Sequence, residues 1–195
     1  MVLAAGAATR MGRLKQLLPY REQTFVQHAI TQVLAARFDP VIVVVGAEAE
    51  AVRAAIAKER IHVVYNEYWR SGMGSSISAG VKRIQQEGFE SAAVAITLAD
   101  QPLVTAEHLR EMRRQVHLSG ASVIAAQYNG TLGVPAIFAR KMFGTLLNLP
   151  PEVGARQLLR QPGFPVKAFP LPEAATDIDT PDDLQALLSG GATRS

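Results

Sequence analysis

Val41-Ile42-Val43-Val44-Val45-Gly46 is the stretch that decides the fold, because five β-branched residues in a row run into a glycine. An apolar run without polar alternation is typical of a strand that is covered on both faces, as in a parallel sheet flanked by helices. Comparable short runs recur along the chain, with helical periodicity between them. We therefore expect further strands at residues 61–65, 92–98, 121–127, 136–139 and 166–169.

The segments between these strands carry helix signals. Thr24 with Gln27 three residues later predicts a capping box, and apolar residues then follow at helical spacing. Thr105 is expected to cap a second helix, and Thr180-Pro181 followed by acids predicts the start of a last one. The predicted fold is a single three-layer α/β/α domain with a mostly parallel twisted sheet, Rossmann-like, over residues 1–188. Residues 189–195 are Gly-rich and polar, and we expect a disordered tail there.

The composition narrows the function. The chain has 195 residues, 48% of them hydrophobic and 19% charged, with a net charge of +3 and no cysteine. The lack of cysteine excludes disulfides, zinc-thiolate sites and cysteine nucleophiles. No basic run interleaves with aromatics, so we expect no nucleic-acid partner. No apolar run approaches the length of a membrane span and no secretory leader is visible, so we expect no membrane partner and a cytoplasmic location.

The first loop has the composition of an anion site. Leu3-Ala4-Ala5-Gly6-Ala7-Ala8-Thr9-Arg10-Met11-Gly12-Arg13-Leu14-Lys15 runs from a strand into small residues that let backbone N–H groups approach a phosphate. Arg10 and Lys15 add two cations. Neither the P-loop nor the dinucleotide pattern Gly-x-Gly-x-x-Gly occurs here. From the residues alone, a phosphate clamp and a small-residue turn with two solvated cations are equally good interpretations.

Two carboxylates, Asp100 and Asp179, lie next to predicted secondary-structure elements. Asp100 follows the expected strand at residues 92–98 with one residue between, at the edge of the sheet where ligands of α/β proteins bind. Asp179 immediately precedes the predicted last helix. Either could coordinate Mg²⁺, which prefers oxygen ligands, or could instead cap a helix.

A third segment, residues 66–80, opens a helix with small residues after the strand at 61–65. The backbone N–H groups at the start of this helix could meet an anionic or carbonyl group. Trp69, the only tryptophan, is interpreted as a packing residue outside the site. None of the four histidines is assigned a catalytic role.

Together these motifs resemble the molybdenum-cofactor nucleotidyltransferases, the MobA-like NTP transferase family, and especially its cytidylyltransferases. The similarity rests on Leu-Ala-Ala-Gly, Arg-Met-Gly and Lys-Gln-Leu-Leu in the first loop and on Leu98-Ala99-Asp100-Gln101-Pro102. It continues in the Asn-x-x-Trp-x-x-Gly-Met stretch from Asn66 and in Asp177-Ile178-Asp179-Thr180-Pro181, and so spans nearly the whole chain.

The resemblance implies a nucleotide site made of ten residues: Leu3, Ala4, Ala5, Gly6, Arg10, Lys15, Asn66, Gly74, Ser75 and Asp100. Asn66 would read a base edge, and Gly74 and Ser75 would pack near the base or ribose. Arg10, Lys15 and Asp100 would be catalytic, and Asp100 and Asp179 would hold Mg²⁺. Gly133, Pro135 and Arg156 would contact the acceptor. Residues 150–153, Pro-Pro-Glu-Val, depart from the family's Gly-Asp-x before Gly154, which concerns acceptor contacts more than nucleotide contacts.

The activity that the resemblance implies is transfer of a nucleoside monophosphate from CTP to molybdopterin or its molybdenum-bearing form, with a molybdoenzyme as recipient of the product. Leu-Ala-Ala-Gly in place of Leu-Ala-Gly-Gly favours CTP over GTP, because the methyl group of Ala5 narrows the pocket. Alternatives are a guanylyltransferase, a nucleotidyltransferase acting on a sugar or methylerythritol phosphate, and a non-catalytic nucleotide-binding accessory protein. A dinucleotide-dependent oxidoreductase is disfavoured by the missing glycine fingerprint.

Overall fold

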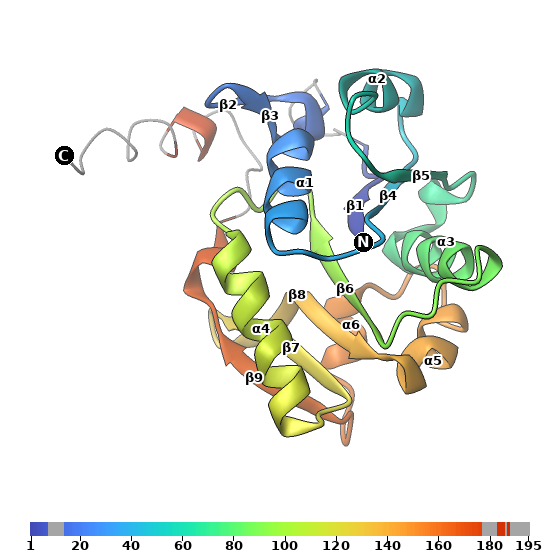
Figure 1. Cartoon of the computed structure of the whole chain (residues 1–195), viewed down its shortest axis with the longest axis vertical. Coiled ribbons are helices and arrows are strands. Elements are labelled where there is room, and N and C mark those ends of the chain that lie inside the picture. Colours follow the sequence, from blue (N-terminus) through green and yellow to red (C-terminus); the bar gives the residue numbers. More distant parts are fainter. Residues whose placement is uncertain (8–13, 177–182, 186, 188–195) are drawn as a thin grey trace.

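Helices cover both faces of a seven-stranded sheet in the computed structural model, which describes residues 1–7, 14–176, 183–185 and 187 (Figure 1). The strand order is β5-β4-β1-β6-β8-β7-β9. All strands are parallel to their neighbours except β8, which runs antiparallel to both β6 and β7. The strands are β1 (Val2–Ala4), β4 (Ile42–Val45), β5 (His62–Tyr65), β6 (Ala93–Leu98), β7 (Val123–Tyr128), β8 (Thr131–Ala139) and β9 (Val166–Pro170).

Two hydrophobic cores lie on opposite faces of this sheet. Successive side chains of a strand point to opposite faces, so Val2 and Ala4 of β1 join one core and Leu3 joins the other. Helices α1 (Phe25–Ala35), α2 (Ala49–Ala55) and α4 (Ala106–Ser119) cover the first face. Helices α3 (Met73–Gln86), α5 (Phe143–Leu147) and α6 (Ala155–Leu159) cover the second. The three-layer α/β/α architecture is therefore confirmed.

The helix starts follow the predicted capping chemistry. Thr24 Oγ1 accepts a hydrogen bond from the Gln27 backbone N–H at 3.4 Å, and Gln27 Oε1 accepts one from the Thr24 N–H at 2.8 Å. Thr105 and His108 form the same reciprocal pair at the start of α4. Each pair satisfies backbone N–H groups that have no partner inside the helix. A short hairpin, β2 (Pro19–Tyr20) and β3 (Gln23–Thr24), precedes α1.

The segment before residue 136 differs from the prediction. The strand predicted at residues 136–139 begins earlier, because β8 starts at Thr131 and includes Gly133 and Pro135. Ala126 pairs with Gly133 and Ala125 with Ala136, so two residues of β8 lie between the paired stretches. This irregularity accommodates Pro135, which has no N–H to donate to a regular ladder.

The described residues contain no helix long and apolar enough to cross a bilayer. Residues 183–185 are helical, and the predicted helix start at Thr180 lies outside the described residues, as does the boundary at 188 with its tail.

Candidate nucleotide site

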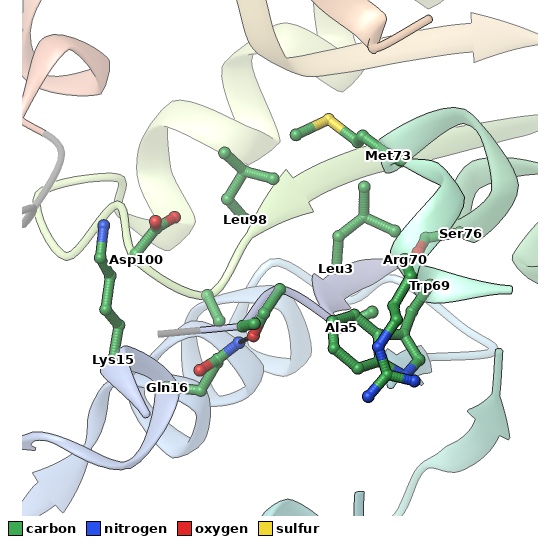
Figure 2. A pocket seen from close by; sticks show the side chains of 14 residues that line it. Leu3, Ala5, Lys15, Gln16, Trp69, Arg70, Met73, Ser76, Leu98 and Asp100 are labelled. Carbon is green, nitrogen blue, oxygen red and sulfur yellow. Dashed lines mark hydrogen bonds between the residues drawn. The ribbon is translucent and has the colours of Figure 1, made fainter. Parts of the chain in front are cut away.

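A cavity of about 720 Å³ opens where β1, β5 and β6 end (Figure 2). This is the carboxyl edge of the parallel strands, where ligands of open α/β sheets bind. Five residues of the predicted site line the cavity: Leu3, Ala5, Gly6, Lys15 and Asp100. Sequence reasoning did not assign the other nine: Ala7, Gln16, Trp69, Arg70, Gly72, Met73, Ser76, Leu98 and Ala99.

The end of β1 contributes the floor of the cavity. Leu3 and Ala5 face it, whereas Ala4 belongs to the core on the opposite face, because neighbouring strand residues alternate. The short helix η1 (Lys15–Leu17) returns the chain to this edge and supplies Lys15. Figure 2 shows the Lys15 side chain extending toward Asp100, at the end of the cavity away from Trp69 and Arg70.

The pairing of β1 with β6 places Asp100 beside the end of β1, where η1 supplies Lys15. β6 lies beside β1, with Leu3 opposite Leu98, and the Ala99 N–H donates to Leu3 O at 3.2 Å. Asp100 follows directly and presents its carboxylate to the cavity. Lys15 and Asp100, which are 85 positions apart in the sequence, thus line the same cavity.

The loop after Asp100 is tied to α1 through a histidine. The His28 ring lies edge-on to Tyr20, and its Nε2 is 3.0 Å from the carbonyl oxygen of Pro102, to which it donates in the matching tautomer. Burial is the main cause that lowers the pKa of His28 below its ordinary value of 6.5; the hydrogen bond to Pro102 opposes this shift, and Arg21 adds a smaller lowering. Burial therefore disfavours the protonated form of His28.

Asn66 lies behind the cavity wall and does not line it. The side chain is 3% exposed, and its Nδ2 donates to the Ser75 and Ser76 hydroxyl oxygens at 2.8 and 3.0 Å. Its Oδ1 accepts from the Tyr68 N–H at 3.0 Å. These bonds fasten the β5–α3 connection to the first turn of α3, where Ser76 reaches the cavity.

Gly74 and Ser75 also lie outside the cavity lining. A Cβ on Gly74 would collide with the carbonyl oxygen of Pro150, so the absence of a side chain lets the 150–153 loop pack on α3. The Ser75 N–H donates to Pro151 O at 3.4 Å. The segment that departs from the family pattern therefore contacts the beginning of α3, next to the cavity residue Met73.

Trp69, which the sequence suggested as a packing residue outside the site, packs against the core and also lines the cavity. It lies in η2 (Trp69–Ser71), packs partly on both cores, and carries the Arg70 guanidinium 4.4 Å from its ring centroid. A Cβ on Gly46 would lie 2.5 Å from Trp69 Cβ and 2.8 Å from Ala5 O. Gly46, which follows β4, thus leaves the space in which Trp69 sits over the end of β1.

The predicted acceptor residues Gly133 and Arg156 meet on Tyr128 and are not among the residues that line the cavity. A Cβ on Gly133 would collide with the Tyr128 hydroxyl, and Arg156 Nη2 donates to that hydroxyl oxygen at 3.3 Å. Pro135 is buried two positions further along β8. Tyr128, which no sequence signal singled out, therefore links β8 to α6.

Two predicted site residues, Arg10 and Asp179, lie outside the described residues. Within the described ranges, no three side chains from His, Cys, Asp and Glu gather as a ready metal cage. Asp100 is the described carboxylate that lines the cavity. A cation at this site would need oxygen ligands from elsewhere as well, such as the phosphates of a substrate.

Comparison with known proteins identifies the family of this chain. Residues 1–166 match the model of the MobA-like NTP transferase domain. Nicotine blue oxidoreductase of Paenarthrobacter nicotinovorans is 32% identical, over 96% of this chain and 95% of that protein. Purine catabolism protein PucB of Bacillus subtilis is 29% identical, over 93% and 91%. The molybdenum cofactor cytidylyltransferase of Escherichia coli is 26% identical, over 94% and 91%.

Among solved structures, Rv0371c of Mycobacterium tuberculosis in complex with manganese superposes with a TM-score of 0.78. It is 31% identical and covers 96% of both chains.

Proposed function

This chain belongs to the MobA-like NTP transferase family and is a nucleotidyltransferase, and from that premise we propose that it transfers cytidylate from CTP to the phosphate of molybdopterin or its molybdenum-bearing form, releasing pyrophosphate. The observation that carries the proposal is the convergence of Lys15 and Asp100 on one cavity at the carboxyl edge of β1 and β6. A cation and a carboxylate at the same end of one cavity suit a substrate that arrives as a triphosphate with a divalent ion.

The proposed reaction needs no covalent intermediate on the protein. An oxygen of the acceptor phosphate attacks the α-phosphorus of CTP, the bond from that phosphorus to the bridging oxygen breaks, and pyrophosphate leaves. The protein contributes by holding the two substrates in line and by stabilising the charge that develops on the phosphates. Lys15 would supply positive charge to the triphosphate, and Arg10 of the same loop is proposed to do so as well. Ala5, Gly6 and Ala7 would let the loop backbone approach the phosphates.

The chemistry of the cavity fits a divalent cation. Asp100 offers carboxylate oxygens in the cavity, and Mg²⁺ is commonly held by one or two carboxylates together with substrate phosphates. We propose Asp100 as one ligand and Asp179 as the second. The bound ion would neutralise charge on the triphosphate. The structure of Rv0371c with manganese supports a divalent ion in this family.

The other residues of the predicted site take proposed roles that follow from their positions. Asn66, whose polar atoms are hydrogen-bonded internally, would act on the base through the position of Ser76. Ala5 would set the width of the base pocket from the floor. Gly133 and Pro135 would shape the acceptor side, with Arg156 offering a cation to the acceptor phosphate.

The test is pyrophosphate release by the purified full chain with CTP, GTP or ATP, each with and without molybdopterin and Mg²⁺. We expect release that requires molybdopterin and Mg²⁺ and that is fastest with CTP. Asp100→Asn, which keeps the shape of the side chain and removes its charge, should lower the rate by about 100-fold or more.

Each other outcome selects a different function. Faster release with GTP would make the chain a guanylyltransferase. Release with a sugar or methylerythritol phosphate in place of molybdopterin would keep the chemistry and replace the acceptor. Nucleotide binding without release from any acceptor would indicate an accessory protein. Because nicotine blue oxidoreductase is a relative, NAD(P)H oxidation is measured in parallel, and turnover there without pyrophosphate release would refute the proposal.

A further inference from the structure

Two buried glutamines directly follow the two charged residues of the cavity. Gln16 follows Lys15, Gln101 follows Asp100, and their side chains are 7% and 3% exposed. In each, the single amide nitrogen donates to two backbone carbonyl oxygens. Because a carbonyl oxygen can only accept, these partners fix which end of each amide is nitrogen.

The bonds of Gln16 join η1 to the end of β1. Its Nε2 donates to Ala4 O at 3.2 Å and to Gly6 O at 2.7 Å, one carbonyl on each side of the cavity residue Ala5. The backbone of Lys15 is thereby held against the loop that is proposed to receive the phosphates. A shift of η1 would move Lys15 relative to that loop.

Gln101 makes the equivalent connection for the acid. Its Nε2 donates to Val134 O in β8 at 3.1 Å and to Ala174 O in η4 (Pro172–Ala175) at 2.8 Å. The loop that carries Asp100 is therefore fastened to two segments distant in sequence. One of them, Val134, lies between the predicted acceptor residues Gly133 and Pro135.

Both amides are retained at an energetic cost. Gln16 Oε1 and Gln101 Oε1 are buried, and neither has a hydrogen-bond partner within the described ranges. Leaving a buried acceptor unpaired costs on the order of 1–3 kcal/mol. A methionine of similar shape would avoid this cost but would remove the amide donor from these carbonyl oxygens, so the pattern points to the N–H bonds as the reason for glutamine at both positions.

We propose that Gln16 and Gln101 are paired positioning residues, which hold Lys15 and Asp100 at the separation that a triphosphate with its divalent ion requires. The proposal rests on the proposed function of the cavity. The two glutamines are linked through the β1–β6 pairing, in which the Ala99 N–H donates to Leu3 O. Gln16 fixes the segment that carries Lys15 to the end of β1, and Gln101 fixes the loop that carries Asp100 after β6.

The test compares Gln16→Met and Gln101→Met in the full chain by two binding measurements. CTP affinity is measured calorimetrically without metal, and Mn²⁺ affinity is measured by electron paramagnetic resonance without nucleotide. We expect Gln16→Met to weaken the affinity for CTP about tenfold and to leave the affinity for Mn²⁺ unchanged. Gln101→Met should weaken the affinity for Mn²⁺ about tenfold and leave the affinity for CTP unchanged. Tenfold is about the lower end of the effects measured for residues that orient a ligand-binding side chain without touching the ligand. Gln16→Glu and Gln101→Glu, which keep the shape and lose both N–H donors, should change the affinities in the same directions and serve if a methionine variant does not fold.

Gln32→Met is the matched control, because Gln32 Oε1 accepts from the Ala106 N–H at 2.9 Å and joins α1 to α4 away from the cavity. It should lower the melting temperature and leave both affinities at the parent's values. If Gln16→Met and Gln101→Met behave like this control, the glutamines only stabilise the fold and the proposal is wrong. If the parent protein itself binds neither CTP nor Mn²⁺, the proposed function has failed, and that result is visible before any variant is compared.

Discussion

Substituting Gly46 with alanine should displace Trp69 and thereby disturb the cavity. The added Cβ would lie 2.5 Å from Trp69 Cβ, 2.7 Å from Trp69 Cγ and 2.8 Å from Ala5 O. Ala5 O also accepts the Ala47 N–H at 3.1 Å, which fixes it in the sheet edge. Trp69 is thus the neighbour that must move. Because its Cβ takes part in the clash, its backbone in η2 must shift together with the indole, and overpacking of this kind costs about 1–3 kcal/mol.

The consequence can be measured on both stability and the site. For a chain of this length, each kcal/mol lowers the melting temperature by about 2–4 °C, so Gly46→Ala should melt roughly 2–12 °C below the parent. Trp69 is the only tryptophan, so its emission spectrum reports the displacement directly. CTP affinity, measured by calorimetry, should fall because Trp69 lines the cavity.

Gly144→Ala is the matched control for this prediction. A Cβ at Gly144, within α5, would meet nothing within 4 Å, so the same chemical change has room there. It should leave emission and CTP affinity unchanged and keep or raise the melting temperature, since alanine favours helix over glycine by up to about 1 kcal/mol. Parent-like emission and melting in Gly46→Ala would show that the space beside Trp69 is larger than these distances state, and the reasoning would be refuted.

Three further predictions concern charge, hydrogen bonding and pH. Lys15→Met should lower kcat/KM for pyrophosphate release by about 100-fold, because a cation that stabilises the developing phosphate charge is lost; an unchanged kcat/KM would remove Lys15 from the mechanism. Asn66→Ala should lower the free energy of unfolding in urea by about 1–3 kcal/mol, because the buried Ser75 and Ser76 hydroxyls lose a donor and the Tyr68 N–H loses its acceptor. Asn148→Ala, at an exposed position, should cost little. Equal losses in the two variants would contradict a stabilising role of the buried network. His28 has a lowered pKa when folded, so the unfolded chain binds its proton first, and the free energy of unfolding should fall as pH drops below about 6.5. His28→Gln should flatten that fall, and a parent-like pH profile in this variant would exclude His28 as its cause.

Much of the fold was predictable because its strands are continuous apolar runs. The stretch at residues 41–45 predicted β4, and the capping pair of Thr24 and Gln27 predicted the start of α1. The antiparallel strand β8 was not predictable in full. A glycine and a proline within five residues indicate a loop by local chemistry, and only the pairing with β6 and β7 keeps Gly133 and Pro135 in a strand.

The candidate site divides in the same way. Lys15, Asp100 and the small residues after β1 line the cavity, as expected from loops at the carboxyl edge of a sheet. The strand alternation that turns Ala4 away from Ala5 was available in the sequence, since neighbouring strand residues point to opposite faces. The internal hydrogen bonds of Asn66 and the space that Gly46 leaves for Trp69 depend on tertiary contacts, which no local pattern contains.

The central claim is that this cavity catalyses nucleotidyl transfer, and the fate of the α-phosphate tests it most directly. The full chain is incubated with Mg²⁺, molybdopterin and CTP that is radiolabelled at either the α- or the γ-phosphate, and the products are separated. We predict that the α-label appears in the pterin product together with one pyrophosphate released for each transfer, and that the γ-label leaves only as pyrophosphate. Transfer of the γ-label to the acceptor, or no transfer of the α-label to molybdopterin or any other phosphorylated acceptor, would contradict the claim.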